Sequence, residues 1–418
     1  MEGLRDVFQN LPAFCFSYPF IMAWYWMAGG LFYHLWRERG FNTPDDPPAL
    51  DEWPPISVLI PCFNESETAI ETLTAAHDVD YPDFEIIAIN DGSSDDTAEI
   101  LDRLAQSLPR LRVIHLATNG GKARALNIGA RLAQHELLFC IDGDALIDPH
   151  ALRWAAYNFR RADVGVFTGN PRVRNRSTVL GRMQVGEFCS IIGLIKRAQT
   201  AYGSLFTVSG VAAGYRRKAL QDAGWWSSDT MTEDIDVTWR IQLAGWQAIY
   251  APSVIVWILM PETLKGLWRQ RLRWAEGGAQ IMVDHGLAVL RLRCPPLIPI
   301  YLSYLLSVVW SYAMLISILA GLRDLTGWGG FGILTGVSLI PAWAGLVLCL
   351  TYLLQAMVSH LLERRYEPTM FRSLFWVIWY PLAFWLISMA TTVVAVPRVL
   401  FGRKEKRGKW VSPDRGLR

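Results

Sequence analysis

Long uncharged apolar runs alternate with segments of ordinary polarity along this chain. The runs span 11–33, 297–322, 331–358 and 373–397. Each is at least as long as the roughly 20 residues that a helix needs to cross a bilayer. The first run exceeds the apolar core of a signal peptide and has neither a basic lead nor a small-residue cleavage site, so a retained anchor is favoured over a cleaved signal. The pattern therefore predicts four membrane segments.

The side of the membrane on which the chain ends is ambiguous. The segment 398–418 carries eight basic residues and is expected to stay in the cytoplasm. Three crossings after a cytoplasmic domain would place it outside. Pro381 in the fourth run, or Pro341 in the third, can turn one run into a re-entrant or interfacial piece. We therefore expect 373–397 to be either a crossing or a re-entrant helix.

A polar region separates the first and second runs. Within it, short β-rich apolar runs at 56–61, 84–90, 111–116 and 136–141 alternate with polar segments of helical spacing. This alternation predicts a mostly parallel, doubly wound sheet whose ligands bind at the carboxyl ends of the strands. Arg37 and Arg39 follow the first run and place this domain in the cytoplasm. The expected divisions are an N-terminal tail (1–10), a membrane helix (11–36), a linker (37–55), a catalytic domain (56–259), interfacial amphipathic helices (260–296), membrane segments (297–322, 331–358 and 373–397) and a basic tail (398–418).

Composition supports a membrane protein that works in a reducing compartment. The 418 residues are 52% hydrophobic and include 19 tryptophans, and the mean hydropathy is +0.20. The six cysteines form no C-x-x-C pair, which argues against a zinc site or a disulfide framework. A net charge of +2 without a basic and aromatic array gives no indication of a nucleic-acid partner.

Chemically distinctive residues follow the expected strands. Asp142-Gly143-Asp144 ends an apolar run with two carboxylates that can face one cation, which suits half of a Mg²⁺ or Mn²⁺ diphosphate site. A plain turn with capping carboxylates is the alternative. Asp91 precedes Gly-Ser-Ser and suits either a nucleobase contact or a helix cap. Lys122, after two glycines, can face a phosphate or remain a solvent-exposed lysine.

Two further stretches suit catalysis. In MTEDIDVTWR, Glu233 and Asp234 follow Thr232, so they are candidates for a general base or for ordinary capping at a helix start. In QRLRWAEGG, Gln270 and Arg273 are three residues apart and share a helix face, with Trp274 adjacent. Arginine and tryptophan beside an apolar run also fit an interfacial helix at headgroup depth. Within the polar region no expected strand is followed by a G-x-G-x-x-G or a P-loop motif, so the nucleotide need not be NAD or ATP.

These motifs carry a family resemblance. PCFNE, NDGSSDDT, GKARALN, DGD, TED and QRLRW occur in the order and spacing of processive family 2 glycosyltransferases, the membrane synthases of hyaluronan, chitin, cellulose and poly-N-acetylglucosamine. The closer similarity is to bacterial poly-β-1,6-N-acetylglucosamine synthases, which make a biofilm exopolysaccharide. It rests on NPRVRNRSTVLGRMQVGEF, SIIGLIKRAQ, FTVSGVAAGYRR, ILMPETLKGLWRQRLRWAEGGAQ and KWVSPDRG.

The resemblance implies a GT-A (Rossmann-like) cytoplasmic catalytic domain in an α-helical protein of the bacterial inner membrane, with UDP-N-acetylglucosamine as donor. Donor-binding roles would fall to Glu65 and Asp91 (uridine), Lys122 (nucleotide), Asp142 (ribose or metal), Asp144 (Mg²⁺ or Mn²⁺) and Arg273 (departing UDP). Catalytic roles would fall to Asp234 as base, with Glu233, Gln270, Arg273 and Trp274, and the acceptor sugar would meet Glu187, Ser209, Gly210 and Trp274.

The resemblance also implies partners. Besides the UDP-sugar, the growing polysaccharide and membrane lipid, it implies a small membrane subunit with cyclic di-GMP at the shared interface. The alternatives are a related hyaluronan, chitin or cellulose synthase, a single-addition transferase acting on a lipid, and a non-catalytic membrane scaffold. A scaffold is expected to have lost Asp144, Asp234 or Arg273, and all three are present.

Overall fold

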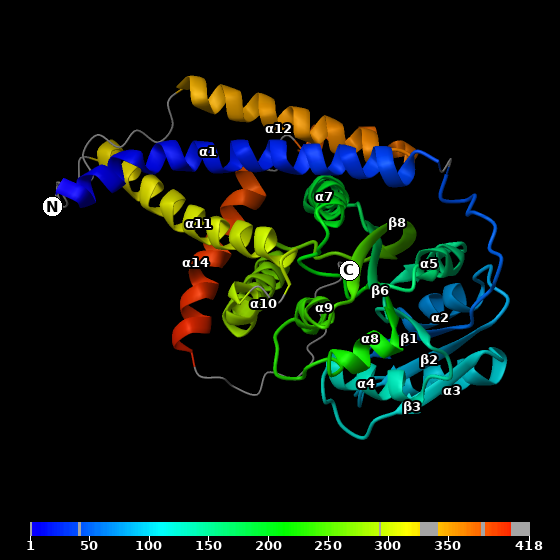
Figure 1. Cartoon of the computed structure of the whole chain (residues 1–418). Coiled ribbons are helices and arrows are strands. Elements are labelled where there is room, and N and C mark those ends of the chain that lie inside the picture. Colours follow the sequence, from blue (N-terminus) through cyan, green and yellow to red (C-terminus); the bar gives the residue numbers. More distant parts are fainter. Residues whose placement is uncertain (1, 41–42, 292–293, 327–341, 378–380, 403–418) are drawn as a thin grey trace.

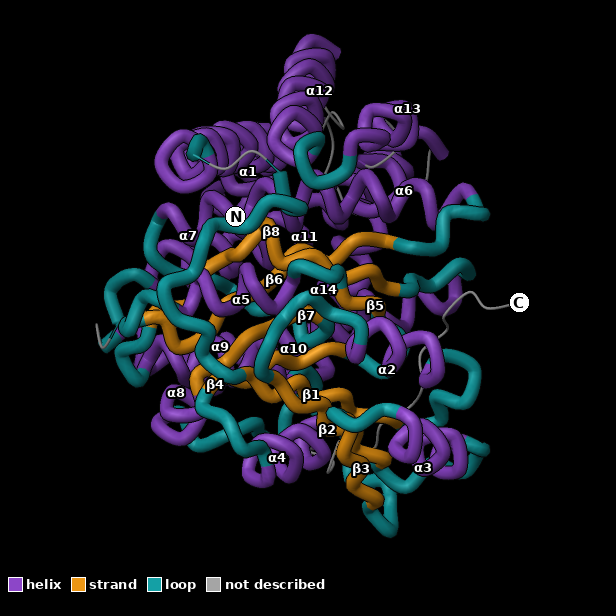
Figure 2. Tube along the Cα trace, turned by 90° about the vertical axis from the view of Figure 1, so that its right-hand side faces the viewer, coloured by secondary structure: helices purple, strands orange, loops and turns teal. Residues whose placement is uncertain are grey.

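A single twisted sheet organises residues 56–259, the part of the molecule that the sequence predicts to be catalytic (Figure 2). The computed structural model describes residues 2–40, 43–291, 294–326, 342–377 and 381–402. In these ranges eight strands form the sheet, in the order β3-β2-β1-β4-β7-β6-β8-β5. The strands are β1 Ile56–Cys62, β2 Phe84–Asn90, β3 Leu111–His115, β4 Leu137–Ile141, β5 Leu146–Ile147, β6 Val164–Val173, β7 Ala212–Arg216 and β8 Gln247–Ile258.

The first half of the sheet is parallel, as its apolar runs predict. β3, β2, β1 and β4 run parallel, whereas β7 is antiparallel to both β4 and β6. The four strands expected from the sequence are confirmed within one or two residues at each end. Because the parallel strands finish at one edge, the residues that follow them are gathered there.

Helices cover both faces of the sheet because side chains alternate along each strand. Val58 and Ile60 of β1 pack in one core with α2, α3 and α5, whereas Leu59 packs in a second core with α4, α8 and α9. The helices of this part are α2 Ala69–His77, α3 Thr97–Ser107, α4 Lys122–Leu132, α5 Ala151–Phe159, α6 Val179–Glu187, η2 Phe188–Ile195, α7 Lys196–Ala201, α8 Arg217–Asp222 and α9 Glu233–Leu243.

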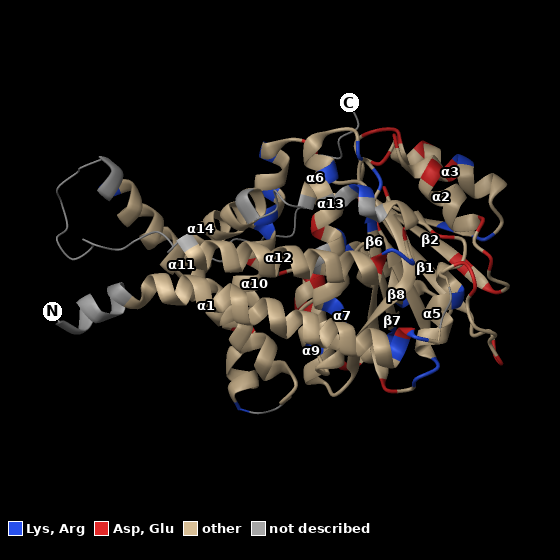
Figure 3. Ribbon diagram, turned by 90° about the horizontal axis from the view of Figure 1, so that it is seen from above, with Lys and Arg blue, Asp and Glu red and all other residues tan. Residues whose placement is uncertain are grey.

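The remaining helices form an elongated extension. They are α1 Glu2–Tyr33, η1 His34–Glu38, α10 Leu264–Leu290, α11 Leu297–Thr326, α12 Ala342–Glu363, η4 Pro368–Ser373, α13 Leu374–Val377, η5 Pro381–Trp385 and α14 Leu386–Phe401. Among the described residues, three helices are long and apolar enough to cross a membrane: Leu297–Arg323, Trp343–Glu363 and Ala383–Phe401. Charged side chains gather on the catalytic part and are sparse along the projecting α1 and α11 (Figure 3).

The structure describes some of the expected membrane segments completely and others only in part. The aromatic-rich α1 is helical throughout but is not among those three helices. Pro341, the start of the third run and most of the basic tail lie outside the described residues. The last helical stretch begins at Pro381, after the short η4 and α13. α14 runs across the direction of α1 and α12 instead of alongside them (Figure 1).

A buried ionic cluster connects the helices η1 and α12 to the sheet. Arg197 of α7 donates to Glu38 at 2.8 Å and also pairs with Glu363 at the end of α12. Arg172 of β6 pairs with the same Glu363. All four side chains are buried. Because removing one partner would leave an uncompensated buried charge, this cluster holds α1, α12 and the sheet in one arrangement.

Candidate active site

The acidic residues expected at the strand ends do converge. Asp91 directly follows β2, and its backbone amide donates to the carbonyl of Cys62, the last residue of β1. Asp142 and Asp144 come just after β4, beside β1 in the sheet. Parallel pairing of these strands therefore builds the site from segments that lie up to 80 residues apart in sequence.

Asp91 organises the glycine-rich loop. Its side chain is fully buried, and its carboxylate accepts hydrogen bonds from the backbone amides of Gly120, at 3.0 Å, and Gly121, at 2.8 Å. Gly92 beside it has φ +66°, and a Cβ there would lie 2.7 Å from the backbone of Asn119. Asp91 thus shapes the loop that leads into Lys122, a contact that the sequence did not predict.

Glu65 lies against the Asp142-Gly143-Asp144 turn. It is 1% exposed, and Thr68 donates a 2.8 Å hydrogen bond to its carboxylate. A Cβ added to Gly143 would come within 3.0 Å of the Glu65 Cγ and 3.1 Å of the Pro61 carbonyl oxygen. A side chain at position 143 would therefore press against Glu65 and the end of β1, so the turn fits most closely with glycine.

Lys122 is the central cation of the site. Its Nζ donates to Asp142 Oδ1, lies 3.8 Å from Glu233 Oε1 and donates at 3.4 Å to the carbonyl of Gly210. Burial alone would lower the pKa of this lysine, but the Asp142 and Glu233 carboxylates raise it above its usual value. Lys122 therefore stays charged, as a fixed cation facing an anionic ligand must be.

The TED segment meets Lys122 from the other side. Glu233 and Asp234 begin α9, and Asp234 Oδ2 accepts from the Gly210 amide at 3.2 Å. A Cβ on Gly210 would lie 3.3 Å from both Asp234 Oδ2 and Lys122 Nζ. Burial raises the pKa of Glu233 in spite of the nearby Lys122. The carboxylates of Glu233 and Asp234 and the Lys122 ammonium therefore lie together around Gly210.

Ser209 and Gly210 are held by residues that sequence reasoning missed. The Ser209 amide donates to Thr168 Oγ1 at 2.9 Å, and Lys196 Nζ donates to the same oxygen at 3.0 Å. Burial lowers the pKa of Lys196 to about 7, against an opposing effect of Asp234. Lys196 could have been singled out in the sequence because it lies in the apolar stretch SIIGLIKRAQ and buried lysines are rare.

The QRLRW segment lies on α10, close to the TED segment. A Cβ on Gly277 would fall 2.1 Å from Thr232 Oγ1, so this glycine permits the two elements to touch. Arg273 lies on the same helix, and its charge opposes the rise in the pKa of Glu233 that burial causes. On the same helix, the oxygen Gln270 Oε1 is buried and has no hydrogen-bond partner among the described residues.

Glu187 has a partner that the sequence did not predict. Arg271 donates to its carboxylate at 2.6 Å, and both side chains are 8% exposed. The Arg271 guanidinium also lies 4.2 Å from the centre of the Trp274 ring. The sequence predicts that Glu187 and Trp274 both contact the acceptor sugar. In the structure Arg271 contacts both side chains, so it links the Glu187 carboxylate to the Trp274 ring.

The carboxylates fit a divalent cation that is shared with a ligand. Among the described residues, no group of three or more His, Cys, Asp or Glu side chains is placed to hold a metal. The turn offers only Asp142 and Asp144, and Asp142 also pairs with Lys122. Mg²⁺ is commonly bound by one or two carboxylates plus phosphate oxygens, so this donor set suits a metal that arrives with a diphosphate.

Comparison with known proteins decides the family. Residues 54–277 match the family model described as "Glycosyltransferase like family 2". The chain belongs to glycosyltransferase family 2. It is thus a glycosyltransferase, and the expected family, enzyme class and GT-A-like fold within a membrane protein are confirmed.

Relatives of this family 2 member match nearly the whole chain. A Staphylococcus aureus protein named poly-β-1,6-N-acetyl-D-glucosamine synthase is 36% identical over 405 residues, covering 96% of this chain and 98% of the relative. A Staphylococcus epidermidis protein of the same name is 35% identical over 413 residues, with the same coverage. A Pyrobaculum calidifontis mannosyltransferase, solved with GDP-Man and Mn²⁺, shares the fold at TM-score 0.64 and 21% identity, covering 96% of this chain and 99% of its own.

Proposed function

We propose that this enzyme polymerises N-acetylglucosamine from UDP-N-acetylglucosamine into poly-β-1,6-N-acetyl-D-glucosamine. The observation that carries the proposal is the 36% identity to a synthase of that polymer across 96% of the chain, membrane helices included. The clustering of Lys122, Asp142, Glu233 and Asp234 supports it, because transfer from a nucleotide sugar needs both a cationic diphosphate site and a base.

In this proposal, Asp234 takes the proton from the acceptor hydroxyl as that oxygen attacks the anomeric carbon. A single displacement converts the α-linked donor into a β-linked product, and UDP leaves. Lys122 and the fork of donors on Arg273 stabilise the departing diphosphate. Trp274 offers an apolar face to the acceptor sugar. Mg²⁺ or Mn²⁺, held by Asp144 and Asp142, would neutralise charge on the same diphosphate when bound.

The uridine end of the donor belongs at Asp91 and Glu65 in this proposal. Both are buried beside the β1 and β2 ends, where a doubly wound sheet places a nucleotide. Asp91 also orders the loop of Gly120 and Gly121, so nucleotide binding and the position of Lys122 are linked. Ser209 and Gly210 shape the acceptor side, next to Asp234.

We further infer that the enzyme lies in a bacterial inner membrane with its catalytic domain in the cytoplasm. α1, α11 and α12 would cross, and α14 would lie along the membrane surface. Its transverse course supports this assignment, as does the 3.2 Å ion pair between Arg398 of α14 and Glu276 of α10 (Figure 1). With α14 at the surface, the basic tail remains on the cytoplasmic side, as its charge requires.

A small membrane partner subunit, with cyclic di-GMP bound where the two chains meet, completes the proposal. Few membrane segments are available to build a channel for a polysaccharide. A partner subunit would supply further membrane segments, and a nucleotide bound between the two chains would couple them.

The donor test uses membranes that contain the full chain. UDP release is measured with UDP-N-acetylglucosamine, UDP-glucose and UDP-glucuronate, supplied separately, with the partner subunit and cyclic di-GMP added. We expect release only from UDP-N-acetylglucosamine. Asp234→Asn should reduce it by about 10²- to 10⁴-fold, the usual contribution of a general base. Asp229→Asn, an exposed aspartate five residues earlier, serves as the matched control and should behave like wild type.

Two results would contradict the proposal. Turnover of UDP-glucose or UDP-glucuronate in preference would identify a related cellulose or hyaluronan type of synthase. No turnover of any donor under these conditions would favour the non-catalytic scaffold.

A further inference from the structure

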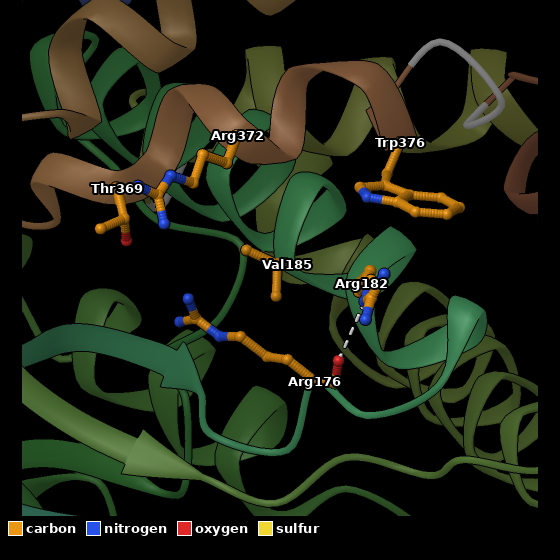
Figure 4. A pocket seen from close by; sticks show the side chains of 6 residues that line it. All are labelled: Arg176, Arg182, Val185, Thr369, Arg372 and Trp376. Carbon is orange, nitrogen blue, oxygen red and sulfur yellow. Dashed lines mark hydrogen bonds between the residues drawn. The ribbon is translucent and has the colours of Figure 1, made fainter.

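A cationic cavity lies where the catalytic domain meets the last helices (Figure 4). Its volume is about 410 Å³. One side comes from the segment after β6 and from α6, and the other from η4 and α13. The lining residues are Arg176, Arg182, Val185, Thr369, Arg372 and Trp376. No acidic side chain is among them, so positive charge accumulates around an open space.

The arginines of the cavity are incompletely neutralised. Arg176 pairs with Glu367, yet its Nη2 is buried and has no hydrogen-bond partner among the described residues. Arg182 and Arg372 form no ion pair within the described ranges. An unsatisfied buried donor is costly, and like charges that face one cavity repel each other. An anion in the cavity would relieve both penalties.

The geometry suits a phosphate group. The guanidinium groups of Arg176 and Arg372 extend toward the side of the cavity where Thr369 lies, while Arg182 and Trp376 lie on the other side (Figure 4). The Arg182 guanidinium is 5.5 Å from the centre of the Trp376 ring, and its Nε donates to the Arg176 carbonyl at 3.1 Å. Planar arginine forks and a hydroxyl are typical phosphate ligands.

The position of the cavity indicates where the phosphate comes from. η4 and α13 join α12 to α14, two apolar helices, and Phe375 of α13 is 60% exposed. Exposed aromatic side chains beside arginines are characteristic of the headgroup layer of a membrane. Arg176 and Arg182 belong to the NPRVRNRSTVLGRMQVGEF segment, and the proposed transfer reaction gives neither of these two arginines a role.

We propose that Arg176, Arg182 and Arg372 form a binding site for the phosphate group of an anionic ligand, with the headgroup of an anionic phospholipid as the source that the position of the cavity favours. The site lies apart from the Lys122 and Asp234 cluster and does not depend on the proposed polymer. A lipid bound there would fasten η4 and α13 to α6, whose Glu187 fixes Arg271 and Trp274. Lipid composition would thereby act on the acceptor side of the active site.

The test measures binding to the purified full chain in lipid-depleted detergent. Native mass spectrometry follows one molecule of phosphatidylglycerol per chain, with phosphatidylcholine as the zwitterionic comparison and pyrophosphate as a soluble competitor. The variant is Arg182→Gln with Arg372→Gln. The matched control is Arg103→Gln with Arg160→Gln, two exposed arginines on the catalytic domain with the same change in charge. Arg372→Gln alone, at an exposed position, is the second variant.

We expect phosphatidylglycerol to bind the double variant at least about tenfold more weakly than it binds wild type, because the variant removes two charge-assisted contacts to the phosphate. The control should bind like wild type. Displacement of the lipid by pyrophosphate would assign the site to soluble phosphate ligands, and resistance to displacement would assign it to the headgroup.

The proposal would be overturned if wild type, both variants and the control bound phosphatidylglycerol with the same affinity as one another, and likewise pyrophosphate. UDP release by the same preparations is recorded separately. If the proposed transferase function is wrong, wild type as well as the variants will release no UDP. If only the proposed anion site is wrong, UDP release by wild type will be unaffected.

Discussion

At the scale of single residues, the site depends on two lysines in contrasting surroundings. Lys122 is surrounded by carboxylates and its pKa is raised, so it remains a cation. Lys196 is more deeply buried, its hydrogen bond among the described residues goes to the hydroxyl of Thr168, and burial lowers its pKa to about 7. The first lysine suits a diphosphate, and the second supports the Ser209 loop through Thr168.

Lys196 should make stability depend on pH. Because its pKa is lowered on folding from 10.5 to about 7, the unfolded chain binds more protons between these values, and stability should rise with pH across that window. We expect the free energy of unfolding of wild type, relative to Lys196→Met, to increase by about 1 kcal/mol per pH unit from pH 7 to 10. Denaturant unfolding in detergent measures this difference.

The matched control for this measurement is Lys265→Met, because Lys265 is exposed on α10. Its difference from wild type should stay flat across the same pH range. If the difference in free energy of unfolding between wild type and Lys196→Met also did not change with pH, folding would not shift the pKa of Lys196 and the prediction would be wrong.

Residues at strand ends were predictable, and their distant partners were not. Asp91, Asp142 and Asp144 were predicted because parallel strands bring their carboxyl ends to one edge. The contacts of Thr168 with Lys196 and of Arg271 with Glu187 join segments 28 and 84 residues apart. No local pattern encodes such pairings, since they depend on how α7, α6 and α10 pack around the sheet.

At the scale of elements, α9 and α10 act as one unit. Asp236 of α9 accepts from His285 of α10 at 2.9 Å and pairs with Arg240 on its own helix. Gly277 lets α10 approach Thr232 at the start of α9. The helix that carries QRLRW is therefore positioned by the helix that begins with the TED acids. The TED and QRLRW motifs were found separately in the sequence, and their contact requires the folded chain.

The transverse course of α14 gives a prediction for the membrane topology. If α14 lies along the surface, the tail is on the same side as the catalytic domain. Ser412→Cys in a Cys349→Ser background should then react with a membrane-impermeant maleimide only after the inner membrane is permeabilised. Ser228→Cys, exposed on the catalytic domain, is the control and should label in parallel. Labelling of the tail alone in intact cells would mean that α14 crosses.

Hydropathy predicted which segments are apolar but not how the helices that they form are oriented. The runs that contain α11 and α14 have similar mean hydropathies, 2.0 and 1.7. α14 instead packs across α10 and α11, and Tyr312 of α11 donates to the Val393 carbonyl. Packing between helices sets such directions, so the ambiguity in the sequence could be addressed only in three dimensions.

At the scale of the whole molecule, α10 packs both against α9, which begins with the TED acids, and against the apolar helices α11 and α14. The buried cluster of Arg197, Glu38, Glu363 and Arg172 connects α1 and α12 to the sheet that positions Asp142 and Asp144. A rigid connection of this kind suits an enzyme that passes each lengthened product from its site toward a membrane. The likeness to synthases of one polymer extends over both parts, with 98% of the relative covered.

The central claim is the identity of the polymer, and the linkage of the product tests it most directly. Membranes containing the full chain and its partner are supplied with UDP-N-acetylglucosamine, and the product is treated with a hydrolase specific for β-1,6-linked N-acetylglucosamine. The account predicts a polymer that this hydrolase degrades and a chitinase leaves intact. A polymer that resists the β-1,6-specific hydrolase would contradict it.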